Sequence, residues 1–159
     1  TYDSVGNVTS ITNGNGKVTT YTYDQLSNVV EKMTALGDKE TYRYNLNNQL
    51  EKVTKADGET IRYDYNQLDQ LLTVDYSKKE DGQVLYAYDA DGRRVSMSDL
   101  TGTTQYETNE EGEVTGVRQG DGSVITYSYD DFGNISQLTY PDGSSVSYTY
   151  DDLDRLTSV

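Results

Sequence analysis

The chain contains neither cysteine nor histidine among its 159 residues. Their absence excludes thiol nucleophiles, disulfides, histidine-based acid–base catalysis and the usual zinc sites. It does not fix the compartment, because a cysteine-free chain suits both an oxidising exterior and a cytosol. We therefore predict no catalytic residue, no metal ligand and no cofactor, and we expect that the protein is not an enzyme.

Positive charge and long apolar runs are also scarce. Lys and Arg number 13 against 27 Asp and Glu, which leaves a net charge of −14. A surface this negative repels the phosphates of nucleic acids and the headgroups of anionic lipids. No apolar run approaches the roughly 20 residues of a membrane span, and no signal-peptide pattern opens the chain. We expect neither a nucleic-acid partner nor membrane insertion.

Tyrosine, by contrast, is abundant: the chain has 16 tyrosines, and they recur with a period. A Tyr followed by Asp or Asn returns about every 21 residues, at Tyr2-Asp3, Tyr23-Asp24, Tyr44-Asn45, Tyr65-Asn66, Tyr88-Asp89, Tyr129-Asp130 and Tyr150-Asp151. Thr108-Asn109 is the eighth member, in which Thr replaces Tyr. A fixed period near twenty indicates stacked supersecondary units, whereas disordered chains are poor in aromatic residues.

Two columns of turn residues follow the same period. The first stands three residues after each Asp or Asn, at Gly6, Ser27, Asn48, Asp69, Gly92, Gly112, Gly133 and Asp154. The second lies about half a period later, at Asn15-Gly16, Asp57-Gly58, Asp81-Gly82, Asp121-Gly122 and Asp142-Gly143. Most of these residue types tolerate a positive φ angle, and Asn-Gly or Asp-Gly between apolar segments favours a hairpin.

The segment before each Tyr-Asp alternates between apolar and polar residues. Ile125, Tyr127 and Tyr129 share one face, opposite Thr126 and Ser128. The segments ending at Tyr65 and Tyr150 alternate in the same way, as half-buried strands do. One repeat is therefore a β-hairpin, which gains stability only by stacking on its neighbours. We predict an all-β fold of tandem stacked hairpins in a long twisted or spiralling sheet, as a single array of about eight repeats over residues 1–159.

Several units resemble the YD repeats of the RHS family, most closely 86–95, 127–135 and 148–156. The family includes polymorphic bacterial toxins, cocoon subunits of insecticidal toxin complexes, wall-associated proteins and teneurins. The resemblance implies a β-sheet shell, which encloses an effector in toxins and serves as an adhesion scaffold in teneurins. It thus implies a structural segment of a secreted or cell-surface protein. The alternative is a carbohydrate-binding or cell-adhesion module that contacts a surface glycan.

Some residues could instead carry chemistry. The pairs Asp130/Asp131 and Asp151/Asp152 could act as acid and base, and the segments 13–16 and 89–92 look like pieces of a calcium loop. However, the Asp of the Tyr-Asp pair recurs in almost every unit, and neither loop continues to the bidentate Glu of a calcium site. An Asp that accepts backbone N–H bonds at the start of a turn explains the pattern better.

Three further features stand outside the regular pattern. Tyr76 and Tyr140 lie out of register and are the better candidates for an exposed contact. The period stretches at a charged loop, residues 77–81, and the unit at 106–109 loses its second Tyr. The sequence also begins and ends within a repeat, so we expect further repeats of the same chain as its partners and end-to-end association of the isolated fragment.

Overall fold

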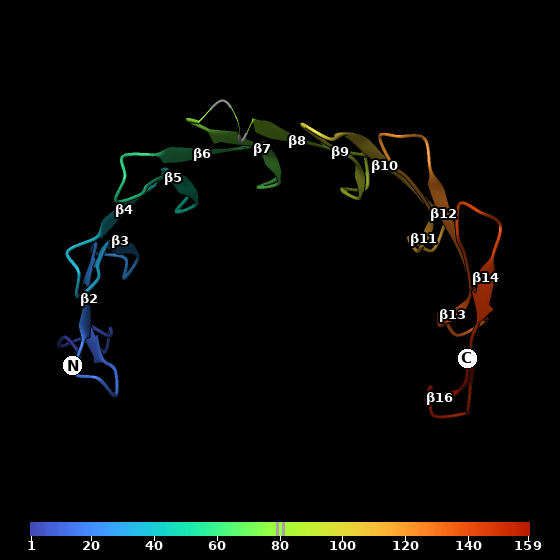
Figure 1. Ribbon diagram of the computed structural model, residues 1–159, viewed down its shortest axis with the longest axis horizontal. Coiled ribbons are helices and arrows are strands. Elements are labelled where there is room, and N and C mark those ends of the chain that lie inside the picture. The colour runs from blue at the N-terminus through green and yellow to red at the C-terminus, as the bar shows by residue number, and fades with distance from the viewer. Residues whose placement is uncertain (79, 81) are drawn as a thin grey trace. The chain divides into compact units, whose positions relative to one another are not determined.

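A computed structural model describes residues 1–78, 80 and 82–159, and Figure 1 shows the arrangement of its strands. The chain divides into two compact units, Thr1–Gln83 and Val84–Val159. The described residues contain strands and turns but no helix. Strands β1 to β14 follow one another in the sheet in their order along the chain, so the prediction of an all-β stack of hairpins is confirmed.

The first unit is an antiparallel meander in which each strand pairs with the next along the chain. Its strands are β1 (Ser10–Thr12), β2 (Val18–Tyr23), β3 (Val29–Met33), β4 (Lys39–Tyr44), β5 (Leu50–Thr54), β6 (Thr60–Tyr65) and β7 (Leu71–Tyr76). A bridge between Tyr2 and Val8 precedes them. The register places apolar residues of neighbouring strands opposite one another, as in Tyr63 opposite Val74.

The second unit repeats this arrangement. Its strands are β8 (Gln83–Tyr88), β9 (Arg94–Asp99), β10 (Gly102–Thr108), β11 (Val114–Arg118), β12 (Val124–Tyr129), β13 (Ile135–Thr139), β14 (Ser145–Ser147), β15 (Thr149–Tyr150) and β16 (Leu156–Ser158). Strands β15 and β16 form a separate two-stranded sheet. Tyr148 separates β14 from β15, yet its N–H still donates to the Ser136 carbonyl at 2.9 Å.

Two series of turns join the strands, and the turns at 13–17, 34–38, 55–59, 119–123 and 140–144 of the second series use the same backbone bonds as the first. In the turn that follows Tyr23, the Asp24 N–H donates to the Asn28 carbonyl at 3.0 Å and the Ser27 N–H donates to the Asp24 carbonyl at 3.2 Å. The column that contains Ser27 has a positive φ in every repeat: Gly6, Ser27, Asn48, Asp69, Gly92, Gly112, Gly133 and Asp154. Only residues that tolerate this conformation fit there.

The second series of turns places the predicted glycines at positive φ. Gly16, Gly58, Gly82, Gly122 and Gly143 have φ angles between 69° and 88°. The Asn-Gly and Asp-Gly pattern did not predict Gly37 and Gly102, at φ 87° and 124°, because Leu36 and Thr101 precede them instead of Asn or Asp. Lys79 and Asp81 of the charged loop at 77–81 lie outside the described residues.

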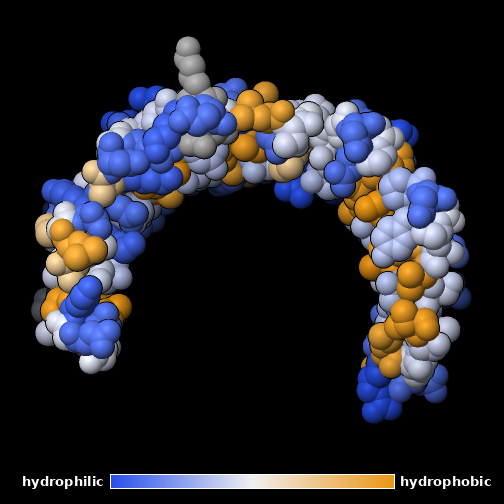
Figure 2. All heavy atoms as spheres, in the orientation of Figure 1, coloured by the Kyte–Doolittle hydropathy of each residue, from blue (hydrophilic) through white to orange (hydrophobic). Residues whose placement is uncertain are grey.

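The tyrosine face of the strands is half-buried rather than fully buried. In β12 the apolar positions Ile125, Tyr127 and Tyr129 are partly covered, while Thr126 and Ser128 are exposed, as the alternation predicted. Among the described residues, the buried apolar side chains are Val53 and Val74, which are 9% and 6% exposed. Within each unit the described strands form a single layer, so hydrophobic residues remain visible at the surface (Figure 2).

Candidate functional site

The tyrosine of the Tyr-Asp pair connects one repeat to the repeat before it. Its hydroxyl donates to the backbone carbonyl fifteen residues earlier: Tyr23 to Val8 at 2.7 Å, Tyr44 to Val29 at 3.1 Å, Tyr65 to Leu50 at 3.0 Å, Tyr129 to Val114 at 2.8 Å and Tyr150 to Ile135 at 3.0 Å. The acceptor is in each case the aliphatic residue that follows the preceding turn. The recurrence of tyrosine is thus explained by a hydroxyl donor on a ring long enough to reach the preceding repeat.

Each of these tyrosines also stands at an irregularity in the strand register. In β12, Ser128 lies opposite Gln137 whereas Tyr129 lies opposite Ile135, so Ser136 is the extra residue of a β-bulge. The same shift occurs between Thr22 and Tyr23. A bulge bends and twists a strand locally. Here the bulge places the tyrosine of the Tyr-Asp pair opposite the aliphatic residue at the start of the next strand.

The Asp or Asn of the pair closes the turn that follows it. The Oδ1 of Asp130 accepts the N–H of Phe132 at 2.9 Å and that of Asn134 at 2.9 Å. Asn45 does the same with Asn47 and Gln49, both at 3.0 Å. Corresponding bonds to the residue four positions later recur at Asp3, Asp24, Asn66, Asp89, Asn109 and Asp151. These side chains satisfy backbone donors that the turn would otherwise leave unpaired.

The residue four positions after the Asp or Asn complements it. Where the first residue is Asp, the partner is a donor, Asn or Arg; where it is Asn, the partner is an acceptor-bearing Gln or Glu. Asn28 Nδ2 donates to Asp24 Oδ2 at 3.0 Å, whereas Asn109 Nδ2 donates to Glu113 Oε2 at 2.7 Å. The sequence patterns described above did not predict this pairing or the role of Glu113.

The same column also contacts the next repeat. Asn7 Nδ2 donates to Ser27 Oγ at 3.1 Å, and Asn134 Nδ2 donates to Asp154 Oδ1 at 2.9 Å. Asn28 bonds Asn48, and Gln49 bonds Asp69, in the same way. Two charged residues of this column, Arg93 and Glu113, lie against a glycine of the next repeat: a Cβ at Gly112 would lie 3.1 Å from Arg93 Nε, and a Cβ at Gly133 would lie 3.0 Å from Glu113 Oε1.

The electrostatics of the turns favour ionised carboxylates. The bond from the Asn28 side chain and the N–H bond of the same residue lower the pKa of Asp24. The N–H of Asn134 lowers the pKa of Asp130, and Arg155 lowers that of Asp151. Burial raises the pKa of Tyr65 and of Tyr129, so their hydroxyls keep the proton that they donate.

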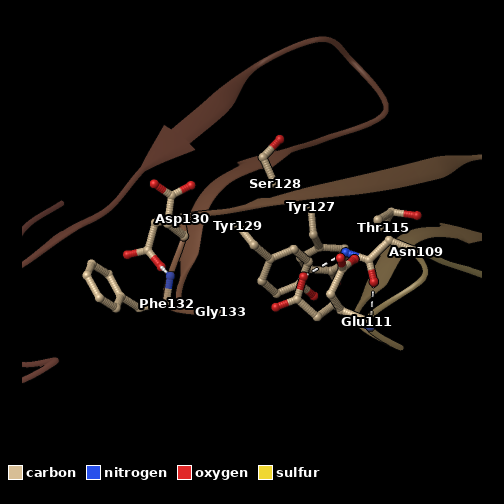
Figure 3. Close-up of a pocket in the computed structure, with 11 residues that line it drawn as sticks. Asn109, Glu111, Thr115, Tyr127, Ser128, Tyr129, Asp130, Phe132 and Gly133 are labelled. Atoms are coloured by element: carbon tan, nitrogen blue, oxygen red, sulfur yellow. Dashed lines mark hydrogen bonds between the residues drawn. The ribbon is translucent and has the colours of Figure 1, made fainter.

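A depression of about 760 Å³ lies beside the Tyr129 turn, and Figure 3 shows its lining. Tyr127 and Tyr129 project into it together, whereas Ser128 points to the opposite face of β12 (Figure 3). Asp130 and Asp131 also line it. The Asp130 carboxylate is already occupied by its own turn. No group of three or more acidic side chains placed to hold a metal occurs within the described residues.

The remaining candidates lie in ordinary positions of the fold. Asn13 and Asp89, in the two segments that look like calcium loops, direct an oxygen at backbone N–H groups of their own turns. Tyr140 is 43% exposed, whereas Tyr76 is half-buried opposite Ile61. In the described residues no helix is long and apolar enough to cross a membrane.

Comparison with known protein families identifies the repeat. The profile of the RHS repeat matches residues 2–41, 44–80, 109–145 and 137–159, which together exceed half of the chain. The chain belongs to the RHS repeat family. No curated protein sequence matches this RHS repeat chain.

Solved structures share the fold of this RHS repeat chain at low sequence identity. The crystal structure of TcdB2–TccC3–Cdc42 gives a TM-score of 0.72 at 17% identity, over 88% of this chain and 9% of that chain. The crystal structure of TcdB2–TccC3–TEV gives 0.70 at 18% identity, over 89% and 9%. The Photorhabdus luminescens Tc holotoxin pore with a mutated TccC3 gives 0.70 at 19% identity, over 89% and 9%. The chain thus spans about a tenth of these proteins, and it is a structural repeat segment.

Proposed function

We propose that the chain is a wall segment of a larger β-sheet shell, with a mechanical role and no catalytic one. The observation that carries this proposal is that the repeated side chains form hydrogen bonds within the sheet and its turns. The tyrosine hydroxyls bond the preceding repeat, and the Asp and Asn carboxyl or amide oxygens bond their own turns. The residues that recur from repeat to repeat are thus engaged in joining repeats or in closing turns, which leaves no unique constellation for chemistry among the described residues.

The parent protein in this proposal is a secreted or cell-surface RHS protein whose shell encloses an effector. Support comes from the fold shared with TcdB2–TccC3 structures, one of which is a Tc holotoxin pore. The surface charge of −14 keeps such a wall soluble and away from nucleic acid. In the larger protein, further repeats of the same chain continue the sheet.

A test of the wall-segment proposal is the deletion of one complete repeat. Deleting residues 130–150 joins Tyr129 to Asp151, the same two columns, and leaves every remaining strand antiparallel to its neighbour. A nearest-neighbour array tolerates this change with a modest loss of stability. We expect a retained β-sheet circular dichroism spectrum and a cooperative urea transition at a lower midpoint.

The matched control deletes only residues 130–140, half a repeat. This removes β13 and makes neighbours of β12 and β14, two strands of the tyrosine series, and the Tyr150 hydroxyl loses its acceptor, the Ile135 carbonyl. Because the bond between consecutive repeats cannot form at this junction, we expect a larger loss of stability than from deleting a complete repeat. Equal tolerance of both deletions would contradict a repeat array as the unit of the structure.

The second candidate function, glycan binding, is favoured by the half-buried tyrosine rings that line the open face of β12. An aromatic ring with a partly exposed face can stack on a sugar. Binding on a glycan array that free sugar competes away would support this function, and the absence of any competed signal would contradict it.

A further inference from the structure

Two departures from the repeat pattern meet at one place in the second unit. Arg94 occupies the column that is otherwise aliphatic, as at Val114 and Ile135, and Thr108 occupies the column that is otherwise tyrosine. In other repeats the tyrosine hydroxyl reaches back to the carbonyl of that aliphatic residue, as Tyr129 does to Val114. At Thr108 the phenol ring is absent, and the side chain in the position it would contact is a guanidinium.

The Arg94 guanidinium lies on aromatic rings. Its central carbon is 4.7 Å from the centroid of the Tyr106 ring and 5.9 Å from that of the Tyr86 ring, both within cation–π distance. Among the described residues, no hydrogen bond or ion pair engages its N–H donors. This contrasts with Arg155, which pairs with Asp151 at 2.7 Å. Arg94 therefore presents a fork of donors held against an aromatic platform.

An open depression of about 450 Å³ lies beside Arg94. Its walls are aromatic and aliphatic, from Tyr106, Tyr127, Val114 and Ile135 among others, and no acidic side chain lines it. Residues 84–159 contain four Arg and no Lys against fourteen Asp and Glu, a balance of 4 − 14 = −10. An acid-free surface around a cation in so acidic a unit favours an anionic ligand locally.

We infer that this depression binds a small acid in which a carboxylate is joined to a phenyl or phenol ring. The ring fills the place where the other repeats have a tyrosine, and it packs against Tyr106 and Tyr127 in offset or edge-to-face contact. The carboxylate accepts bonds from the Arg94 fork, the geometry for which a guanidinium is best suited. The repeats with an aliphatic residue in the Arg94 column and a tyrosine in the Thr108 column have neither the guanidinium nor the vacant ring position.

The test measures binding of 4-hydroxyphenylacetate to the full chain by NMR chemical-shift titration. We expect a Kd on the order of 1 mM, as befits a ligand of this size on an open surface. The neutral amide 4-hydroxyphenylacetamide keeps the ring and removes the charge. Since a charge-assisted bond is lost, we expect it to bind roughly tenfold more weakly or worse.

Three variants locate the site. Arg94→Val restores the aliphatic column and Thr108→Tyr restores the tyrosine, so each returns the repeat to its usual pattern, and we expect each to weaken binding at least about tenfold. Arg118→Val is the control, because it removes the same charge from the opposite face of β11: Arg118 lies opposite Gln105, whereas Val117 lies opposite Tyr106. We expect it to leave binding within about twofold.

The outcomes separate clearly, provided that circular dichroism shows each variant to be folded. Loss in Arg94→Val and Thr108→Tyr with retention in Arg118→Val supports the inference. The inference would be overturned if the acid and the amide bound equally well, if all three variants lost binding equally, or if Arg94→Val retained binding. It would also be overturned if the unmodified chain showed no binding at concentrations up to about ten times the expected Kd.

Discussion

Removal of the Tyr129 hydroxyl tests whether the tyrosine column joins consecutive repeats. Tyr129→Phe keeps the ring and its packing but deletes the donor that bonds the Val114 carbonyl at 2.8 Å. Tyr127→Phe is the matched control. Tyr127 lies two residues earlier on the same face of β12, and its hydroxyl donates no hydrogen bond within the described residues. Both changes remove one hydroxyl from the same face of β12, but only Tyr129→Phe removes a hydrogen bond that the described residues make.

The size of the effect follows from the environment of the bond. A neutral intramolecular hydrogen bond contributes about 1 kcal/mol to the free energy of unfolding. The ring of Tyr129 is half-buried, so water can partly replace the lost donor at Val114. We expect Tyr129→Phe to lower the free energy of unfolding by about 1 kcal/mol and Tyr127→Phe by less than about 0.5 kcal/mol. Tyr129→Ala also removes the ring and should cost about 2–3 kcal/mol, below the range for a fully buried aromatic residue.

Urea denaturation followed by circular dichroism provides the assay. A fall in the midpoint at unchanged slope reports a change in stability, whereas a change in slope reports that the array unfolds in parts. If Tyr127→Phe cost as much as Tyr129→Phe, the hydroxyl bond to Val114 would not be what stabilises the column. A loss below about 0.5 kcal/mol for Tyr129→Ala would show that the tyrosine face is not packed at all.

Gly133→Ala should destabilise the protein more than Gly143→Ala in urea titrations. Both glycines have φ 84°, which costs an L-residue about 1–2 kcal/mol, but only at Gly133 would the added Cβ contact Glu113. Equal losses of stability would show that the contact with Glu113 has no effect. Asp24→Asn should destabilise the protein, because the amide of Asn28 then faces a second amide instead of a carboxylate acceptor. Adding Asn28→Gln should restore stability, because it recreates the pair that Asn45 forms with Gln49. An additive double-mutant cycle would disprove the pairing rule. Asp24 and Asp130 have folded pKa values below the ordinary 3.8, so they stabilise the fold above that pH and lose this contribution as the pH falls below it. We therefore expect the urea midpoint to drop between pH 5 and pH 3. The drop should be smaller in the Asp24→Asn/Asn28→Gln variant, which lacks the Asp24 carboxylate.

Local patterns in the sequence were sufficient to predict the strands and most of the turns. The alternation over 125–129 and the positive-φ column at Gly133 depend only on residues next to one another, because side chains alternate at every second position of a strand and few residues adopt a left-handed conformation. The pairing of Asp24 with Asn28 was visible at a spacing of four, yet it emerges only when all repeats are compared. Gly37 escaped because Leu36 gives its turn no Asn-Gly or Asp-Gly pattern.

Contacts between repeats were decided only by the tertiary structure. The partner of the Tyr129 hydroxyl lies fifteen residues away on another strand, and the bulge that sets this distance depends on the register of β12 against β13. The proximity of Arg94 to Tyr106 likewise results from the pairing of β9 with β10. Half-burial of the tyrosines has the same origin: a sequence shows which face is apolar, but how far that face is covered depends on how many layers the chain builds above it.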